Sequence, residues 1–365
     1  MKIVSPLLKR VVYPSLAKAG VFRRSAAGGL AVVTYHGILP TGYKLVDSAL
    51  DGNLITADAF RGQLHVLKKN YNVISPEDML AWSEQQRELP SRAVLLTCDD
   101  GLLNNLTEML PILQQEGLRC LFFVTGASAE PSNGAERSVL WHEELFLIFL
   151  RAPSGRFEVA CEGIEIGGGL GAPEQRRAVW WGSVKQLSQH DQESRKLFLR
   201  AARLHFGRND SLNLTPISRR RFGLMTLSEL RELVSAGMTI GAHTLSHPML
   251  SQLPQELARA EITQSRDCLE AALQQRIWAL AYPFGDPESV TPQVLAMAKE
   301  AGYTAAFLNY GGGLGTDLPL HAIPRVHVTA GMELAEFEAC VAGFHASLQR
   351  SAGRIRQNTL RAARG

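Results

Sequence analysis

Short apolar runs recur along the chain, and most are separated by segments with a helical pattern. Seven of these runs have the character of strands: 29–38 (GLAVVTYHGI), 93–100 (AVLLTCDD), 120–126 (CLFFVTG), 238–244 (MTIGAHT), 277–285 (IWALAYPFG), 304–309 (TAAFLN) and 322–328 (AIPRVHV). Their nearly continuous apolar character is typical of parallel strands that are covered on both faces.

The helical segments between these strands have recognisable starts. Residues 75–78 (SPED) offer a capping serine, a proline at the first helical position and acids in the first turn. Residues 226–229 (TLSE) fit a capping box, and Gly237 is suited to end that helix. Residues 287–302 predict a further helix. Strands alternating with helices predict an α/β architecture with right-handed crossovers.

One long stretch, about residues 129–221, interrupts this alternation. It contains an amphipathic helical pattern (VLWHEELFLIFLRAP), a hairpin pattern (RFEVACEGIEIGGG) and a long helical pattern that begins EQRRAVWW. We interpret it as an insertion that either caps a site or is a purely structural excursion. Its tryptophans Trp141, Trp180 and Trp181 could stack on a sugar, although core packing is the more common role of such side chains.

Polar side chains stand where four of the predicted strands end. They are Tyr35 with His36, Asp99 with Asp100 and Gly101, His243 with His247, and Arg325 with His327. The carboxyl ends of the strands in a parallel α/β barrel converge on one face, and that face carries the site. We therefore expect these residues to meet, although they are far apart in the sequence.

A pair of histidines and a pair of carboxylates suggest a metal site on that face. His243 and His247 follow an apolar strand at a spacing of four, which alone is a weak signal. Two histidines and one aspartate are a common ligand set for a divalent metal that keeps positions open for water and substrate. A cation would also offset the burial of the adjacent Asp99 and Asp100. The alternative is that these acids only form a turn.

Three motifs resemble those of the polysaccharide deacetylases, the NodB-homology domain of the carbohydrate esterases. Residues 97–101 (TCDDG) resemble the family's T-F-D-D-G, 243–247 (HTLSH) its H-[ST]-x-x-H, and 281–285 (AYPFG) its R-x-P-Y-G. The start VVTYHGI is similar to that of the exopolysaccharide-associated members. Order and spacing agree over about residues 29–330, with the insertion outside the motif-bearing core.

This resemblance implies a role for each matching residue. Asp99 would be the general base, while Asp100, His243 and His247 would hold a divalent ion, for which zinc is the first expectation. The backbone N–H of Phe284 would stabilise an oxyanion, with Tyr282 of the same motif beside it, and Thr244 would support the histidine loop. The expected reaction is metal-assisted attack of water on an N-acetyl group, followed by protonation of the departing amine.

The chain departs from the family pattern at two places. Ala281 stands where the family has the arginine that orients the base, and we expect Arg325 to supply that charge. The family's late histidine, the general acid, has His327 as its first counterpart and His321 as its second. His36 could line the same mouth, or it could be a structural histidine.

Composition narrows the class of protein and its compartment. With 45% hydrophobic and 20% charged residues among 365, the chain is ordinary for a soluble globular protein. Its five cysteines form no C-x-x-C spacing, which favours a reducing compartment and disfavours a cysteine-based zinc site. We found no apolar stretch suited to a signal peptide or a membrane span, so we expect a cytoplasmic protein.

The net charge of +3 conceals basic ends on an acidic body. Residues 1–46 hold seven Lys or Arg and no acid, and residues 349–365 hold five arginines and no acid, so the rest carries a net −9. Such ends could contact an anionic membrane face, or they could simply be solvated termini. Nucleic-acid binding is not expected, because the basic residues are not interleaved with aromatic ones.

The sequence therefore predicts a distorted parallel (β/α) barrel of the NodB-homology type with a mainly helical insertion. We expect a basic segment at 1–28, the barrel at 29–330 with the insertion at 129–221, and a C-terminal helix with a basic tail at 331–365. The expected function is N-deacetylation of an acetylated sugar or glycan precursor in surface polysaccharide biosynthesis, in the cytoplasm or at the inner membrane face. The alternatives are a hydrolase of a cyclic amide, a non-catalytic glycan-binding relative and a peripheral membrane scaffold.

Overall fold

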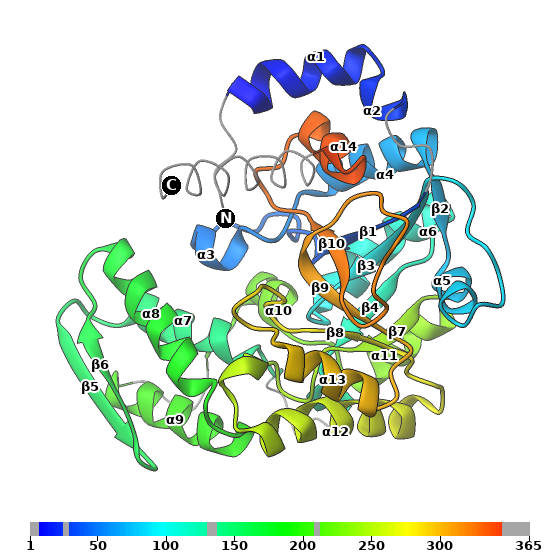
Figure 1. Cartoon of the computed structure of the whole chain (residues 1–365). Helices are drawn as coiled ribbons and strands as arrows, with labels where there is room; N and C mark the ends of the chain where they lie inside the picture. Colours follow the sequence, from blue (N-terminus) through cyan, green and yellow to red (C-terminus); the bar gives the residue numbers. More distant parts are fainter. Residues whose placement is uncertain (1–6, 25–28, 130–136, 208–211, 345–365) are drawn as a thin grey trace, which may run out of the picture.

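Seven parallel strands close into a barrel in the computed structural model, which describes residues 7–24, 29–129, 137–207 and 212–344 (Figure 1). The barrel closes because β1 (Leu30–Tyr35) pairs with both β10 (Ile323–His327) and β3 (Ala93–Cys98). Between β3 and β10 the order is β4 (Leu121–Val124), β7 (Thr239–Ala242), β8 (Ala279–Ala281) and β9 (Ala305–Gly311). The predicted parallel barrel is confirmed. An unpredicted three-residue strand, β2 (Asn72–Ile74), is added outside β3.

Helices cover the outside of this ring. They are α3 (Ser48–Asp51), α4 (Ala57–Asn70), α5 (Pro76–Ser83), η2 (Asn105–Met109), α6 (Leu110–Glu116), η3 (Gly126–Ala129), α11 (Leu227–Ser235), η4 (Leu250–Gln252), α12 (Gln255–Leu273), α13 (Pro292–Glu300) and α14 (Leu334–Val341). The capping box predicted at the start of α11 is present, and the serine predicted to cap α5 forms a capping box with Asp78 there. The helix predicted over 287–302 begins only at Pro292, because Asp286 Oδ1 accepts the N–H groups of Glu288 and Ser289 in a turn and Thr291 then caps the helix.

Alternation along the strands separates two apolar layers. Side chains such as Val32, Leu95, Phe123 and Phe307 fill the barrel interior, while their neighbours, such as Val33, pack between the strands and the helices. Polar side chains such as Asp99 and Arg325 lie in the mouth because they share the parity of the interior residues, whereas Asp100 follows with φ of 78°, where the alternation of the strand has ended.

The insertion forms a lobe beside the barrel with an apolar core of its own (Figure 1). It contains α7 (Trp141–Arg151), β5 (Arg156–Cys161), β6 (Ile164–Gly169), α8 (Pro173–Leu187), α9 (Gln192–His205) and α10 (Pro216–Phe222). The predicted antiparallel hairpin is confirmed as β5 with β6. Phe149, Phe157 and Phe198 pack together in the lobe's core.

The chain's first described helices pack on its last one. They are η1 (Leu8–Val12), α1 (Tyr13–Lys18) and α2 (Val21–Arg24), which lie over α14 through Tyr13, Phe22 and Ala339 (Figure 1). Lys9, one of the basic residues noted at this end, forms an ion pair with Glu336 at 2.9 Å. The arginine-rich tail lies outside the described residues. Among the described helices, none has the length and apolar character to span a membrane.

Candidate active site at the mouth of the barrel

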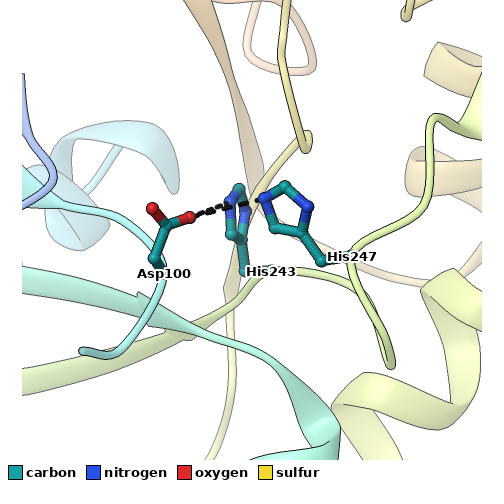
Figure 2. A group of neighbouring side chains, drawn as sticks. All are labelled: Asp100, His243 and His247. Atoms are coloured by element: carbon teal, nitrogen blue, oxygen red, sulfur yellow. Dashed lines mark ion pairs between the residues drawn. The ribbon is translucent and has the colours of Figure 1, made fainter. Parts of the chain in front are cut away.

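The loops that follow β3 and β7 carry the predicted metal ligands into one cluster. Asp100 Oδ1 lies 3.4 Å from Nε2 of His243 and 3.4 Å from Nε2 of His247, and all three side chains are buried (Figure 2). One ligand atom from each residue lies within 4.8 Å of the others. The three residues that we expected to share a cation are therefore brought together from distant parts of the chain.

Two contacts hold the histidine pair: one orients the His243 ring, and the other fixes the backbone of His247. His243 Nδ1 lies 2.7 Å from the carbonyl oxygen of Ala281, so Nδ1–H donates and Nε2 faces Asp100. The N–H of His247 donates to Thr244 Oγ1 at 3.1 Å, as expected for a residue that supports this loop. Thr244 and His247 both have φ of 60°, and such backbone conformations cost on the order of 1–3 kcal/mol each. The surrounding contacts must therefore hold the loop in place.

The charges in this cluster indicate that a cation fits between the three groups. Burial alone would raise the pKa of Asp100, yet its hydrogen bonds to His243 and His247 bring the pKa well below the ordinary value. Burial lowers the pKa of His247, whereas at His243 the hydrogen bond to Asp100 and the nearby carboxylates outweigh burial and raise the pKa. One carboxylate that faces two imidazole nitrogens is stabilised by positive charge between them, from ring protons or from a cation, and this donor set suits a divalent metal.

The second aspartate is held by a buried guanidinium. Both oxygens of Asp99 accept from Arg325, Oδ1 from Nη1 at 2.7 Å and Oδ2 from Nη2 at 2.6 Å. Burial would raise the pKa of Asp99, but the charge of Arg325, with those of His243 and His36, brings it below the ordinary value. Asp99 is therefore an oriented carboxylate that is ionised at neutral pH.

Arg325 itself is fixed inside the barrel. Its Nε donates to the carbonyl oxygen of Leu308 at 2.7 Å, its Nη1 also donates to Thr97 Oγ1 at 3.2 Å, and the guanidinium lies 5.4 Å from the centre of the Phe123 ring. Ala281, which stands at the position of the family's arginine, contributes only its carbonyl group to the site. The structure thus brings Arg325 to the place where we expected a substitute charge, and its role in orienting the base stays a prediction.

Two further histidines lie side by side at the mouth. The rings of His36 and His327 are 4.9 Å apart, and neither His36 Nδ1 nor His327 Nε2 has a hydrogen-bond partner among the described residues. Burial, followed by the positive charge of His36, lowers the pKa of His327 to about 3. His327 is therefore neutral at neutral pH, and it would need a proton from its neighbour to act as the general acid.

Two of the expected site residues lie elsewhere. Tyr282 packs in the layer outside the barrel, and its hydroxyl donates to the carbonyl oxygen of His321 at 2.9 Å. The ring of His321 is bonded through Nε2 to the carbonyl oxygen of Tyr303, which precedes the start of β9. Ala281 points into the barrel, so the next side chain along the strand must point out. The predictions that Tyr282 lines the substrate site and that His321 is the second candidate acid are wrong.

Phe284 lies beside the histidine cluster. Its φ is 60°, and the described residues offer no acceptor for its backbone N–H, so this N–H is free to act as the expected oxyanion donor. Its ring contacts that of His247 at 5.1 Å between centroids and that of Trp181, from α8 of the insertion, at 5.8 Å. The aromatic surface beside the metal ligands therefore continues from the barrel onto the insertion.

Sequence reasoning missed several contacts that shape this mouth. The His142 ring of α7 stacks on His247 at 4.8 Å, and nothing in its amphipathic helix distinguishes it from a core residue. Asn104 and Asn105 hold the loop after β1, since Asn104 Oδ1 accepts from Ile38 N at 3.1 Å and Asn105 Nδ2 donates to His36 O at 3.4 Å. Two adjacent asparagines, three residues beyond the Asp-Asp-Gly motif, were the available signal.

A buried ionic network joins the insertion to the barrel near this mouth. Arg221 of α10 donates to Asp51 at 2.8 Å and to Glu143 of α7 at 2.9 Å, and all three side chains are buried. Burial raises the pKa of Glu143 to about 7, because the opposing charge of Arg221 only partly offsets it and the charge of Asp100 adds to it. The network fixes α7, and with it His142, relative to the barrel.

Comparison with known proteins identifies related sequences and folds. The sequence model described as polysaccharide deacetylase matches residues 86–167 and 214–306. The "Putative polysaccharide deacetylase YxkH" of Bacillus subtilis is 25% identical over 117 residues, which are 32% of this chain and only 41% of that protein.

Solved structures share the fold at low identity. The deacetylase PplD of Streptococcus pyogenes, solved in complex with acetate, has a TM-score of 0.53 at 16% identity over 86% of this chain and 99% of that chain. IcaB from Ammonifex degensii has a TM-score of 0.53 at 17% identity over 87% of this chain and 98% of that chain. The match of the family model skips residues 168–213, which lie in the insertion.

Proposed function

The chain belongs to the polysaccharide deacetylase family, and from that premise we propose that it is a metal-dependent hydrolase that removes N-acetyl groups from an acetylated sugar or glycan precursor. The observation that carries the proposal is that the two adjacent aspartates at the mouth of the barrel have different partners. Asp100 faces two imidazole nitrogens at 3.4 Å, while Asp99 is bound on both oxygens by Arg325. One carboxylate is thus suited to a cation and the other to a proton.

The residues divide the hydrolysis between them in a simple way. Asp100, His243 and His247 would hold the divalent ion, which when bound would polarise the amide carbonyl and lower the pKa of water. Asp99 would accept the proton of the attacking water, because Arg325 holds it ionised and oriented. The backbone N–H of Phe284 would donate to the oxygen on which negative charge develops.

A proton must also reach the departing amine, and the paired histidines are suited to deliver it. His327 is neutral at neutral pH, so in our proposal His36 carries the proton at the mouth and His327 supports it. This replaces the sequence-based prediction, in which His327 was the first candidate for the general acid and His36 was expected only to line the mouth or to be structural. Proton delivery by a positioned side chain contributes about 10²–10⁴-fold to a rate.

The surroundings of the site favour a sugar as the substrate. Phe284, Trp181 and His142 form a half-buried aromatic surface that is continuous with His247. Aromatic rings present a flat apolar face on which the C–H face of a pyranose can stack, while the Trp181 indole also has an N–H at its edge. We propose an acetylated precursor of a surface polysaccharide, processed in the cytoplasm or at the inner membrane face, where basic residues of the N-terminal segment would favour anionic lipids.

The proposal is tested by measuring bound metal and the release of acetate from a panel of N-acetylated sugars. Wild type, Asp99→Asn and His243→Ala form the set. We expect metal in the wild type and in Asp99→Asn, loss of metal in His243→Ala, and loss of activity in both variants. A wild type that binds no metal but hydrolyses cyclic amides would instead support the alternative C–N bond chemistry. A metal-loaded wild type that is inactive on every sugar would contradict the proposed substrate class.

A further inference from the structure

The insertion bonds directly to the loop that carries the metal ligands, residues 243–249. Trp141 of α7 donates its indole N–H to the carbonyl oxygen of His247 at 2.9 Å. Ser188, at the end of α8, accepts the backbone N–H of Met249 at 3.2 Å. The outer half of the histidine loop is therefore held by side chains that lie outside the barrel and outside the family's motifs.

A third helix of the insertion reaches the same loop through a buried guanidinium. Arg195 of α9 is 1% exposed and donates to Ser246 Oγ, and its Nη2 lies 3.5 Å from Glu261 Oε1. Glu261 of α12 in turn accepts the N–H of Ser246 at 2.8 Å. The guanidinium also lies 5.3 Å from the centre of the Trp141 ring, so the two residues support each other. Ser246 is thus clamped between the insertion and the barrel.

The loop needs such support on its outer side. The barrel side holds its first half, where Gly126 N donates to Thr244 O at 2.9 Å and Ala127 N donates to Leu245 O at 2.9 Å. The second half contains His247 with φ of 60°, a conformation that persists only when its surroundings determine it. The bonds from the insertion fall on this second half.

We propose that Trp141 and Arg195 are positioning residues that set the metal affinity of the site by fixing the backbone of His247. The inference rests on the proposed metal centre, because neither side chain is placed to touch a cation. Without the indole donor, the backbone of His247 can relax and its Nε2 moves away from Asp100 Oδ1. Residues that orient a metal ligand in this way typically change metal affinity about 10–100-fold when they are altered. The insertion then supports metal binding and is not only a structural addition to the barrel.

Two matched pairs of variants test this proposal in the full chain by zinc titration against a competing chelator. Trp141→Phe removes the donor to His247, and its control Trp180→Phe removes an indole N–H that donates at 2.7 Å to the carbonyl of His142, within the insertion. Arg195→Lys breaks the clamp on Ser246, and its control Arg203→Lys weakens a pair with Glu144 that joins α9 to α7. We expect about tenfold weaker zinc binding in the two test variants and less than a twofold change in the controls.

A second readout separates positioning from folding. Deacetylation at saturating zinc should recover most of its rate in Trp141→Phe, since the variant lacks affinity and not a reacting group. If all four variants bind zinc as tightly as the wild type does, the proposal is overturned, while the proposed function stays intact. Equal weakening in tests and controls would also overturn it, because general loosening of the insertion would then be the cause. A wild type that binds no zinc would instead remove the metal centre itself.

Discussion

The two aspartates of the site belong to regions that are built in different ways. Asp99 is held entirely by the barrel, since Arg325 comes from β10 and is itself bonded to Leu308 and Thr97. His247, the proposed ligand that faces Asp100, lies on a strained loop whose outer half is bonded to the insertion. The comparison teaches that the proposed proton acceptor is held by the barrel alone, whereas the proposed cation site is also bonded to the insertion.

The largest loss of stability and activity is expected when the contact between Arg325 and Asp99 is removed. Arg325→Gln leaves Asp99 buried without its partner, and removal of one member of a buried pair costs about 3–5 kcal/mol of stability. Because Arg325 holds the pKa of Asp99 down, the variant should raise that pKa and move the acid limb of kcat/KM to higher pH. Urea denaturation and a pH–rate profile measure the two effects.

Arg325→Lys serves as the matched comparison for this prediction, since it keeps the charge and loses the second hydrogen bond. In the wild type, the ionised Asp99 contributes stability above its ordinary pKa, and this contribution is lost as pH falls through the lower pKa of the folded state. If Arg325→Gln leaves the acid limb of the kcat/KM profile unchanged, Arg325 does not influence the pKa of Asp99.

A smaller effect is expected on kcat, and it should differ between variants of the two histidines at the mouth. His36→Gln should lower kcat by about 10²–10⁴-fold, the usual contribution of a general acid or base, while metal content is retained. His327→Gln should cost less, since burial and the charge of His36 keep His327 neutral. Steady-state kinetics with bound-metal analysis distinguish the variants. A larger loss in His327→Gln would return the role of proton donor to His327.

The smallest effect concerns the network that joins the insertion to the barrel. The pKa of Glu143 is raised to about 7 from an ordinary value of 4.5, so the folded state binds this proton more tightly than the unfolded state does. The corresponding stability is fully present below pH 4.5 and is lost as pH rises through 7. The wild type should therefore lose stability relative to Glu143→Gln between these pH values, as measured by urea denaturation. Parallel pH profiles would contradict this.

The barrel half of the site could be predicted from the sequence, and the insertion half could not. Asp99, Asp100 and His243 follow recognisable strands, and the resemblance to the family motifs predicts their order. Arg325 was also predictable, because the motif arginine is absent and a charged residue stands on the last strand. The contacts of Trp141, His142 and Arg195 depend on how the insertion docks, which no local pattern encodes.

The wrong placement of Tyr282 could have been avoided from the sequence alone. Side chains alternate along a strand, so Ala281 inside the barrel places Tyr282 outside, just as Arg325 inside places Val326 in the outer layer. Applied to residues 281 and 282, this parity would have excluded Tyr282 from the mouth. His321 lies before its strand, and position alone argued against it.

Anomalous diffraction from a crystal grown with zinc tests the metal centre most directly. We expect a peak at the zinc edge between Asp100 Oδ1 and the Nε2 atoms of His243 and His247, with Asp99 still bound to Arg325 and not to the ion. A peak at another location, or full-occupancy zinc bound by Asp99 in place of Asp100, would contradict the division of work between the two carboxylates.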